Sequence, residues 1–167
     1  MDENGTKLYE ARTDGHLFQT LNAPSKVIVE VKPGVRGNCP RVRLQETAQM
    51  VAWIHKEPHC EGQMKPNSAT SHHDGDNAVG QVYRRLLISQ NRHEIYLIVA
   101  EYDGEYYDYI TNSKREEPCT SFIWMREFGP WNINNPDDVQ NIASIILAVT
   151  LQFSKDEDQG LGLNLPS

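Results

Sequence analysis

The chain has 167 residues, of which 38% are hydrophobic and 23% are charged, and its formal net charge is −7 at pH 7. A chain of this length can form one domain with a hydrophobic core, and the composition is that of a soluble globular protein. No apolar run approaches the roughly 18 residues that a membrane span needs, which excludes a membrane-spanning protein. The acidic net charge argues against a general nucleic-acid-binding protein.

The N-terminal sequence and the cysteines indicate a protein that stays inside the cell. Residues 1–15 are polar and acidic, and they lack the apolar segment of a secretory signal and the basic amphipathic pattern of a transit peptide. The three cysteines, Cys39, Cys60 and Cys119, form no C-x-x-C pair. An odd number of widely spaced cysteines favours free thiols over a disulfide framework. We therefore expect an intracellular protein, cytoplasmic or nuclear, that does not contact a membrane.

The first predicted elements lie near the N-terminus. Residues 12–21 are compatible with a hairpin or a short strand around an Asp-Gly dipeptide. Residues 26–32, KVIVEVK, are rich in β-branched residues and are followed by a Pro-Gly dipeptide, which predicts a strand. Side chains alternate along a strand, so the three valines share one face of the sheet. The other face carries Ile28, Glu30 and Lys32.

A helix is predicted after Pro40, over residues 41–56. Two adjacent stripes follow helical spacing along this segment. One stripe consists of Leu44, Ala48, Val51 and His55, and the other consists of Gln45, Gln49 and Ala52. A strand followed directly by a helix suggests an α/β layer.

The second half of the chain predicts further strands and a final helix. Residues 57–80 are polar and rich in turn formers, and we expect a long, mobile surface insertion there. We predict strands at 83–90, 93–103, 105–111 and 121–128, with turns at Asn91-Arg92 and Asp103-Gly104 and a strand end at Gly129-Pro130. Tyr102, Tyr106, Tyr107 and Tyr109 are expected to form cross-strand pairs.

A last helix is predicted to begin after Asn135 and to pack on the sheet through its apolar residues. Residues 154–167 are expected to be a disordered tail. The whole pattern predicts a single α/β (α+β) domain over residues 1–153, with a mixed central sheet of five or six strands and two main flanking helices.

One group of residues has the chemistry of a metal-dependent site: Asp14, the tripeptide Glu30-Val31-Lys32, Gln45 and Gln49. Glu30 and Lys32 emerge from one strand face, where a carboxylate and an ammonium are costly unless they pair or bind a ligand. Two carboxylates and a backbone carbonyl offer the hard oxygen ligands that Mg²⁺ or Mn²⁺ prefers. Such a cation can activate water for attack on a phosphodiester, and a lysine beside it can orient or deprotonate that water.

These residues resemble the motif of the PD-(D/E)XK nuclease superfamily. The resemblance rests on Asp14 in TDGHLF, on the E-V-K of VIVEVKP, and on the Q-x-x-x-Q of LQETAQMVAWI. It implies a restriction-endonuclease-like core that uses Mg²⁺ or Mn²⁺ to cleave DNA or RNA. Asp14, Glu30 and the Val31 carbonyl would bind the metal, Lys32 would be the catalytic lysine, and Gln45 would lie close to the active site.

A nuclease of this kind would contact nucleic acid through the basic residues around the motif. Between residues 26 and 56 the chain has six basic residues and two acidic ones, an excess of four positive charges. This local charge favours contact with phosphate despite the acidic total. The predicted nucleic-acid contacts are Arg36, Arg41, Arg43 and Gln49.

The chain also resembles uncharacterised proteins of filamentous fungi. The shared motifs are EVKP, QE-x-A-x-M-x-AWI, SQ-x-RHEIY and a late FGPW, and they cover most of residues 24–153. This second resemblance implies kinship and no particular activity.

Each site residue also has an interpretation that needs no ligand. Glu30 and Lys32 can form a simple ion pair on a half-exposed strand. Gln45 and Gln49 can be solvated helix positions, and Asp14 can stabilise a turn with Gly15. The alternative function is then a catalytically inactive nuclease-like fold that binds a protein or a nucleic acid.

Other polar residues in the sequence are weaker candidates for metal ligands. Any acidic ligand upstream of the motif would have to be Glu3 or Glu10. The histidines and aspartates between residues 55 and 76 lack the paired spacing of a zinc site and are expected to form a polar loop.

Overall fold

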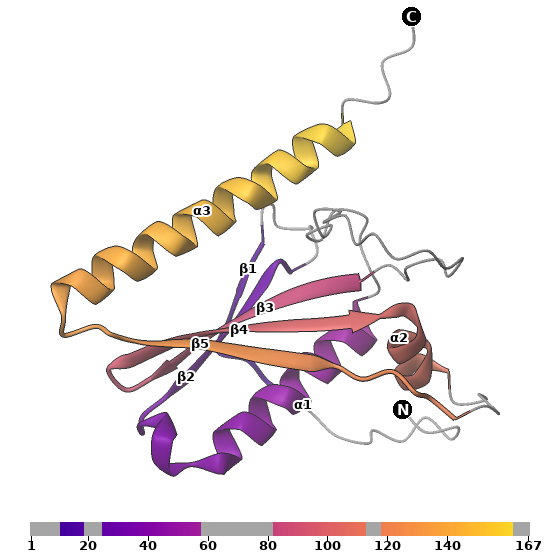
Figure 1. The fold of residues 1–167 in the computed structure, drawn as a ribbon, viewed down its shortest axis with the longest axis horizontal. Coiled ribbons are helices and arrows are strands. Elements are labelled where there is room, and N and C mark those ends of the chain that lie inside the picture. Colours follow the sequence, from indigo (N-terminus) through magenta and orange to yellow (C-terminus); the bar gives the residue numbers. More distant parts are fainter. Residues whose placement is uncertain (1–10, 19–24, 58–81, 113–117, 162–167) are drawn as a thin grey trace, which may run out of the picture.

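The computed structural model describes residues 11–18, 25–57, 82–112 and 118–161 (Figure 1). Within these ranges the chain forms five strands, three α-helices and one short 3-10 helix, η1. In chain order they are β1 (Gly15–Leu17), β2 (Val27–Lys32), η1 (Arg36–Asn38), α1 (Pro40–Lys56), β3 (Val82–Asn91), β4 (Glu94–Asp103), α2 (Gly104–Thr111), β5 (Trp124–Asn132) and α3 (Pro136–Leu161).

The strands form one mixed sheet in the order β1-β2-β3-β4-β5. β2 and β3 are parallel and are joined through α1, whereas the other neighbouring pairs are antiparallel. The helices cover both faces, with α1 and α2 on one side of the sheet and α3 on the other (Figure 1). The predicted fold class, a mixed α+β sheet flanked by helices, is therefore confirmed, with three flanking helices.

Each face of the sheet has its own hydrophobic core. The core under α1 consists of Ile28, Met50, Trp53, Ile54, Leu87, Tyr96, Ile98, Ala100 and Tyr102. The core under α3 consists of Val27, Leu86, Leu97 and Ile142, with Trp131 and further α3 side chains packed around them. Val27 and Ile28 belong to opposite cores, so the predicted alternation along β2 is correct and Glu30 lies on the α1 side.

Helix α1 begins one residue before the predicted start and ends where it was predicted, and the face that it buries is neither of the two predicted stripes. Leu44 is 71% exposed, and Ala48 and His55 are exposed as well. The buried residues are Val42, Glu46, Gln49, Met50, Trp53 and Ile54. Two of these six are polar side chains that bond to η1 and β2. The rotation of the helix is thus set partly by polar partners, which an apolar stripe does not reveal.

The predicted strand at 105–111 is wrong, because this segment is helix α2. Asp103 caps the helix by accepting a hydrogen bond from the Tyr106 backbone N–H at 2.9 Å. The Asp-Gly pair thus starts a helix here rather than a hairpin. Among the tyrosines, Tyr102 does pair across strands with Tyr83, at 5.7 Å between ring centroids. Tyr106 belongs to the helix, and its ring lies 6.2 Å from that of Tyr102.

Strand β5 continues through Gly129-Pro130, where it was predicted to end. The pairing with β4 is irregular between Ile95 and Leu97, next to this dipeptide. Gly129 has φ +114°, and a Cβ atom on it would lie 2.8 Å from the Ile95 carbonyl oxygen. Only glycine allows this backbone conformation and this close approach, so Gly129 lets the strand continue with a changed register.

Several predictions concern residues that lie outside the described ranges or at their ends. The predicted insertion at 57–80 lies outside them, except for Glu57, as do Cys60, Glu3 and Glu10. Cys39 and Cys119 are both free thiols, as expected. Helix α3 begins as predicted and extends to Leu161, and residues 162–167 lie outside the described part of the chain.

Candidate functional site

The candidate site lies where the parallel strands β2 and β3 end, on the α1 side of the sheet. Their register pairs Glu30 with Ser89 and Lys32 with Asn91. On this face of the sheet, these polar side chains follow the apolar pair of Ile28 and Leu87. In sheets with parallel strands, ligands commonly bind at the carboxyl ends of the strands. The predicted motif therefore lies at a position in the fold where ligand-binding residues are common.

Glu30 is a buried carboxylate held by several donors. The residue is only 2% exposed. Gln45 Nε2 donates to Glu30 Oε1 at 3.0 Å, and Gln49 Nε2 donates to Glu30 Oε2 at 2.6 Å. The Lys32 ammonium bonds to Glu30 Oε1 and forms an ion pair with it. These donors compensate for the loss of water around the buried charge, and they fix the orientation of the carboxylate.

Asp14 lies against the backbone between Glu30 and Lys32. Its Oδ2 atom accepts a hydrogen bond from the Val31 N–H at 2.7 Å, and its own N–H donates to the Val29 carbonyl at 3.1 Å. Asp14 directly precedes β1, whose pairing with β2 ends at Gly15 and Val29. The structure therefore brings together Asp14, which precedes β1, and the E-V-K tripeptide of β2.

The Val31 carbonyl points toward the same edge of β2 as the Asp14 carboxylate. Val29 directs its carbonyl toward the β1 side, where Asp14 N–H donates to it. Backbone groups of alternate residues in a strand point to the same side, so the N–H and C=O of Val31 both face this edge. A carboxylate oxygen of Asp14 and the carbonyl oxygen of Val31 therefore lie on the same edge of β2.

Glu30 Oε2 is the carboxylate atom best able to accept a cation. Its Oε1 atom accepts from both Lys32 and Gln45, whereas Oε2 accepts only from Gln49 among the described residues. A carboxylate oxygen has two lone pairs, so one remains on Oε2. The set of Asp14, Glu30 and the Val31 carbonyl consists of hard oxygens and fits Mg²⁺ or Mn²⁺ in chemical type.

The described residues contain no group of three or more His, Cys, Asp or Glu side chains able to hold a metal ion. A site of two carboxylates and one carbonyl has fewer side-chain ligands than such a group. A Mg²⁺ ion commonly keeps several waters and takes only one or two carboxylates from the protein. The donor set around Val31 satisfies that lower requirement.

Gln49 is buried beneath the site and is held on two sides. Its Nε2 atom donates to Glu30 and also to the Arg12 carbonyl at 2.5 Å. Its Oε1 atom is buried and has no hydrogen-bond partner within the described ranges. Gln49 therefore orients Glu30 and is too deeply buried to reach a nucleic-acid backbone, although it was predicted to be a nucleic-acid contact.

Arg36 forms a buried ion pair with Glu46 beside the predicted motif. Its Nη1 and Nη2 atoms donate to the two Glu46 carboxylate oxygens at 2.7 and 2.6 Å, in a bidentate pair. Its Nε atom donates to Glu127 at 2.8 Å, and its guanidinium lies 4.8 Å from the centre of the Tyr96 ring. Burial acts to lower the pKa of Arg36, but the bonds and charges of Glu46 and Glu127 outweigh it and raise that pKa.

The Arg36 guanidinium is thus committed to carboxylates, and its side chain is only 3% exposed. It was predicted to contact nucleic acid, whereas the structure gives it a role in joining η1 to α1 and β5. The other two predicted contacts differ from it. Arg41 is exposed, and Arg43 is 57% exposed and bonds to Glu127 at 3.2 Å at the surface. Of the four predicted nucleic-acid contacts, Arg41 and Arg43 are therefore the two whose side chains face solvent.

Glu127 links the buried and the exposed arginines. Its carboxylate accepts from Arg36 and from Arg43. Burial acts to raise the pKa of Glu127, but the hydrogen bonds and charges of the two arginines lower it below its ordinary value of 4.5. Glu127 therefore stays ionised to a lower pH than an unpaired glutamate, and together with Glu46 it balances the charges of the two guanidinium groups.

Ser89 and Asn91, which pair with Glu30 and Lys32 in the sheet, were not among the predicted site residues. Ser89 and Asn91 are completely buried, and Asn91 Nδ2 donates to Ser89 Oγ at 2.8 Å. The Asn91 Oδ1 atom is a second buried acceptor without a partner in the described part of the chain. One signal was available, because Leu87, Ser89 and Asn91 share a strand face on which polar residues follow an apolar one. Glu46 and Glu127 gave no such signal.

Comparisons of the chain with protein-family models, with curated proteins and with solved structures found no match. Among the helices that the structure describes, none is long and apolar enough to cross a membrane. The geometry of the site is consequently the main basis for a functional proposal.

Proposed function

We propose that this protein is a metal-dependent phosphodiesterase, a nuclease that acts on DNA or RNA with Mg²⁺ or Mn²⁺. One observation carries the proposal: the Asp14 carboxylate bonds to the backbone of Val31, between Glu30 and its ion-pair partner Lys32. This bond joins two separate segments whose residues the PD-(D/E)XK resemblance assigns to one site. A simple ion pair on a strand does not require the second carboxylate.

In the proposed mechanism, Asp14, Glu30 and the Val31 carbonyl would hold the cation. A bound divalent cation supplies a Lewis acid that neutralises charge on the phosphate and activates water. Gln45 and Gln49 hold the Glu30 carboxylate in one orientation through its two oxygens. This fixed orientation limits the reorganisation needed when a substrate binds.

Lys32 has the position of a group that handles the proton of the attacking water. Its side chain is 21% exposed, and its ammonium bonds to the buried Glu30. It can therefore contact both the site and a substrate in solvent. A lysine in such a place orients water, stabilises the charged phosphate or moves a proton.

Arg41 and Arg43, on the first turn of α1, are the proposed contacts to the nucleic-acid backbone. Both are exposed near the site. Each contact to phosphate releases a counterion, so removing one positive charge weakens binding and reduces its salt dependence. The acidic net charge of the chain means that this local basic surface has to supply the attraction.

The proposal is tested first by metal binding. Thermal unfolding of the wild-type chain is followed while Mn²⁺ is titrated, and Glu30→Gln is measured in parallel. At about one hundred times the dissociation constant, a bound metal raises the free energy of unfolding by about 2.7 kcal/mol. Glu30→Gln should lose this stabilisation. Asp108→Asn removes a carboxylate from the exposed surface of α2 and should keep it.

Cleavage is then measured on plasmid DNA, single-stranded DNA and RNA, with Mn²⁺, with Mg²⁺ and with chelator. Activity should require the metal and should fall in Glu30→Gln and in Lys32→Gln prepared in the same way. General acid–base groups typically contribute about 10² to 10⁴ in rate, so both losses should be easy to measure. Equal activity in all three preparations would mean that a contaminant cleaves the substrate, and the proposal would fail.

A second candidate function is supported by the way in which Glu30 is already satisfied. Three donors from within the chain, on Lys32, Gln45 and Gln49, compensate its charge without any metal. A catalytically inactive nuclease-like fold that binds a protein or a nucleic acid would have this property. It predicts that Mn²⁺ stabilises neither the wild type nor Glu30→Gln, while nucleic acid or a protein partner still binds.

A further inference from the structure

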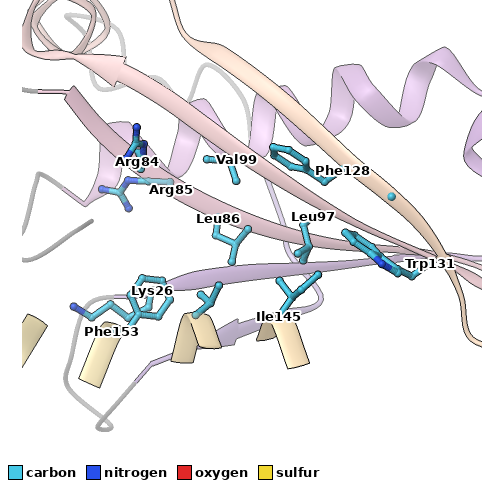
Figure 2. Close-up of a pocket in the computed structure, with 12 residues that line it drawn as sticks. Lys26, Arg84, Arg85, Leu86, Leu97, Val99, Phe128, Trp131, Ile145 and Phe153 are labelled. Atoms are coloured by element: carbon cyan, nitrogen blue, oxygen red, sulfur yellow. The ribbon is translucent and has the colours of Figure 1, made fainter. Parts of the chain in front are cut away.

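A large apolar cavity lies on the opposite face of the sheet from Glu30, between α3 and strands β3 to β5. Its volume is about 400 Å³. The side chains around it include Leu86, Leu97 and Trp131 from the sheet and Ile145, Val149 and Phe153 from α3 (Figure 2). None of these residues belongs to the proposed metal site, so a function of this cavity is independent of the proposed nuclease activity.

The cavity has the size and the lining of a ligand site. Protein interiors are close-packed, and an unfilled apolar space of this size forfeits contacts that its walls would otherwise make. Cavities that bind small molecules have volumes of roughly 300–1,000 Å³ and are mostly apolar, with a few polar groups that orient the ligand. A ligand with a large apolar part would recover the lost contacts.

The basic groups of this cavity gather at one end of it. Figure 2 shows Lys26 and Arg84 at one end and Trp131 at the other. The register agrees, because Arg84 pairs with Glu101 of β4, whereas Trp131 pairs with Ile95. Six residues along a strand correspond to roughly 20 Å. The cavity is thus elongated, with cations at one end and an indole at the other.

The charged side chains next to Arg84 meet at Glu101. Glu101 Oε1 accepts from Arg84 Nε at 2.7 Å, and Glu101 Oε2 pairs with Arg126 at 3.0 Å. One carboxylate is therefore shared by two guanidinium groups, which leaves a positive charge in excess. Lys26 lines the same end of the cavity. An anionic group of a ligand would be attracted to this end.

We propose that the cavity binds a single-chain anionic amphiphile, an acyl carboxylate, with its chain between α3 and the sheet. The chain extends toward Trp131, and the carboxylate lies near Lys26 and Arg84. The shape, the apolar lining and the positive end each select a different part of this ligand. A neutral molecule of the same shape would use only the first two features.

The test compares three probes with the same twelve-carbon chain and different head groups. Dodecanoate, dodecanol and dodecyltrimethylammonium are titrated into the full chain below their micelle concentrations, and binding is followed by calorimetry. Dodecanoate should bind as one molecule per chain and about tenfold more tightly than dodecanol, a factor of the size that a charge-assisted contact provides. The cationic probe should bind most weakly. Equal affinities for all three probes would overturn the assignment of the head-group end.

Two variants locate the binding site. Val149→Phe fills the cavity from α3 and should weaken both dodecanoate and dodecanol at least about tenfold, because the chain loses its space. Leu147→Phe, on the same helix but 59% exposed and outside the lining, is the matched control and should bind as the wild type does. Ile145→Phe replaces the first variant if Val149→Phe does not unfold cooperatively.

The double variant Lys26→Gln/Arg84→Gln tests the charged end separately. It should reduce dodecanoate affinity about tenfold, to that of dodecanol, and leave dodecanol unchanged. The proposal is overturned if the wild type shows no saturable binding, or if Val149→Phe and Ile145→Phe both bind dodecanoate as tightly as the wild type. Binding of dodecanoate that the double variant does not weaken would overturn the contact with Lys26 and Arg84.

Discussion

Gln49 Nε2 on α1 lies 2.6 Å from Glu30 Oε2 on β2, and the two residues are almost completely buried. This hydrogen bond joins the rotation of the helix to the orientation of the carboxylate. When Gln49 faces β2, Glu46 one turn earlier faces Arg36, and Leu44 faces solvent. The polar site and the packing of α1 are therefore parts of one arrangement, and variants of the site will also affect stability.

Replacing Gln49 by leucine should destabilise the fold, because Glu30 loses a donor while it stays buried. A buried polar group left without its partner costs about 1–3 kcal/mol, and more when it is charged. Gln45→Leu is the matched control, because Gln45 donates to the same carboxylate from an exposed position and should have a smaller effect. Urea unfolding measures both. Equal destabilisation by the two variants would contradict the proposed role of burial.

The sequence predicted β2 and the limits of α1, because these depend on local patterns. A run of β-branched residues identifies a buried strand, and Pro40 marks a helix start. The rotation of α1 was not predictable in this way. It depends on the partners of Glu46 and Gln49, which lie on η1 and β2 and are not specified by the sequence of the helix itself.

The contacts of Arg36 and the helical structure of α2 were also not predictable from local sequence patterns. Arg36 meets Glu127, which lies 91 residues further along the chain, and no local pattern reveals this pairing. An arginine in a basic stretch then looks like a phosphate contact. For residues 104–111, tyrosines and an Asp-Gly pair are equally compatible with a hairpin and with a capped helix. The Asp103 cap and packing against the α1 side of the sheet favour the helix.

Breaking the pair between Arg36 and Glu46 should be among the most destabilising single changes in the chain. Glu46→Ala leaves the buried guanidinium with Glu127 alone, and loss of one partner from a buried pair costs about 3–5 kcal/mol. Arg43→Ala removes an exposed pair to Glu127 and should cost about 0–1 kcal/mol. Chemical denaturation compares the two. The double variant Arg36→Met/Glu46→Leu should recover part of the loss, because it leaves no buried charge from the pair.

The lowered pKa of Glu127 predicts a pH dependence of stability. A carboxylate whose pKa is lower in the folded state contributes stability that is present above its unfolded pKa and is lost as pH falls through the folded one. Glu127→Gln should therefore be less stable than the wild type at pH 7, and the difference should shrink below its ordinary pKa of 4.5. Thermal unfolding between pH 7 and pH 3 measures this difference. A difference that stays constant over that range would contradict the assignment.

Gly129→Ala should destabilise the fold, whereas Gly34→Ala should not. At Gly129, φ is +114° and a Cβ atom would lie 2.8 Å from the Ile95 carbonyl oxygen, so both strain and a clash result. Strained backbone conformations cost on the order of 1–3 kcal/mol. A Cβ atom on Gly34 would meet nothing within 4 Å, and the change should be neutral or slightly stabilising because the unfolded chain loses freedom. The midpoint of urea unfolding distinguishes the two variants.

Lys32→Met should separate metal binding from cleavage if the proposed nuclease activity is correct. The Lys32 ammonium occupies Glu30 Oε1 and places a positive charge next to Oε2, the atom that would bind a divalent cation. Removing it frees a lone pair and removes like-charge repulsion, so Mn²⁺ should bind about tenfold more tightly. Cleavage should nevertheless fall by about 10² or more, because the group that orients or deprotonates the water is lost.

Lys56→Met is the control for this prediction, because it removes an exposed lysine from the last turn of the same helix that carries Gln45 and Gln49. It should change neither Mn²⁺ affinity nor cleavage. Calorimetry with Mn²⁺ and a plasmid assay measure the two quantities in each variant. Weaker Mn²⁺ binding in Lys32→Met would show that the lysine supports the site instead of competing for it. Unchanged cleavage would remove Lys32 from the mechanism, and Asp14 and Glu30 would then have to act without a lysine.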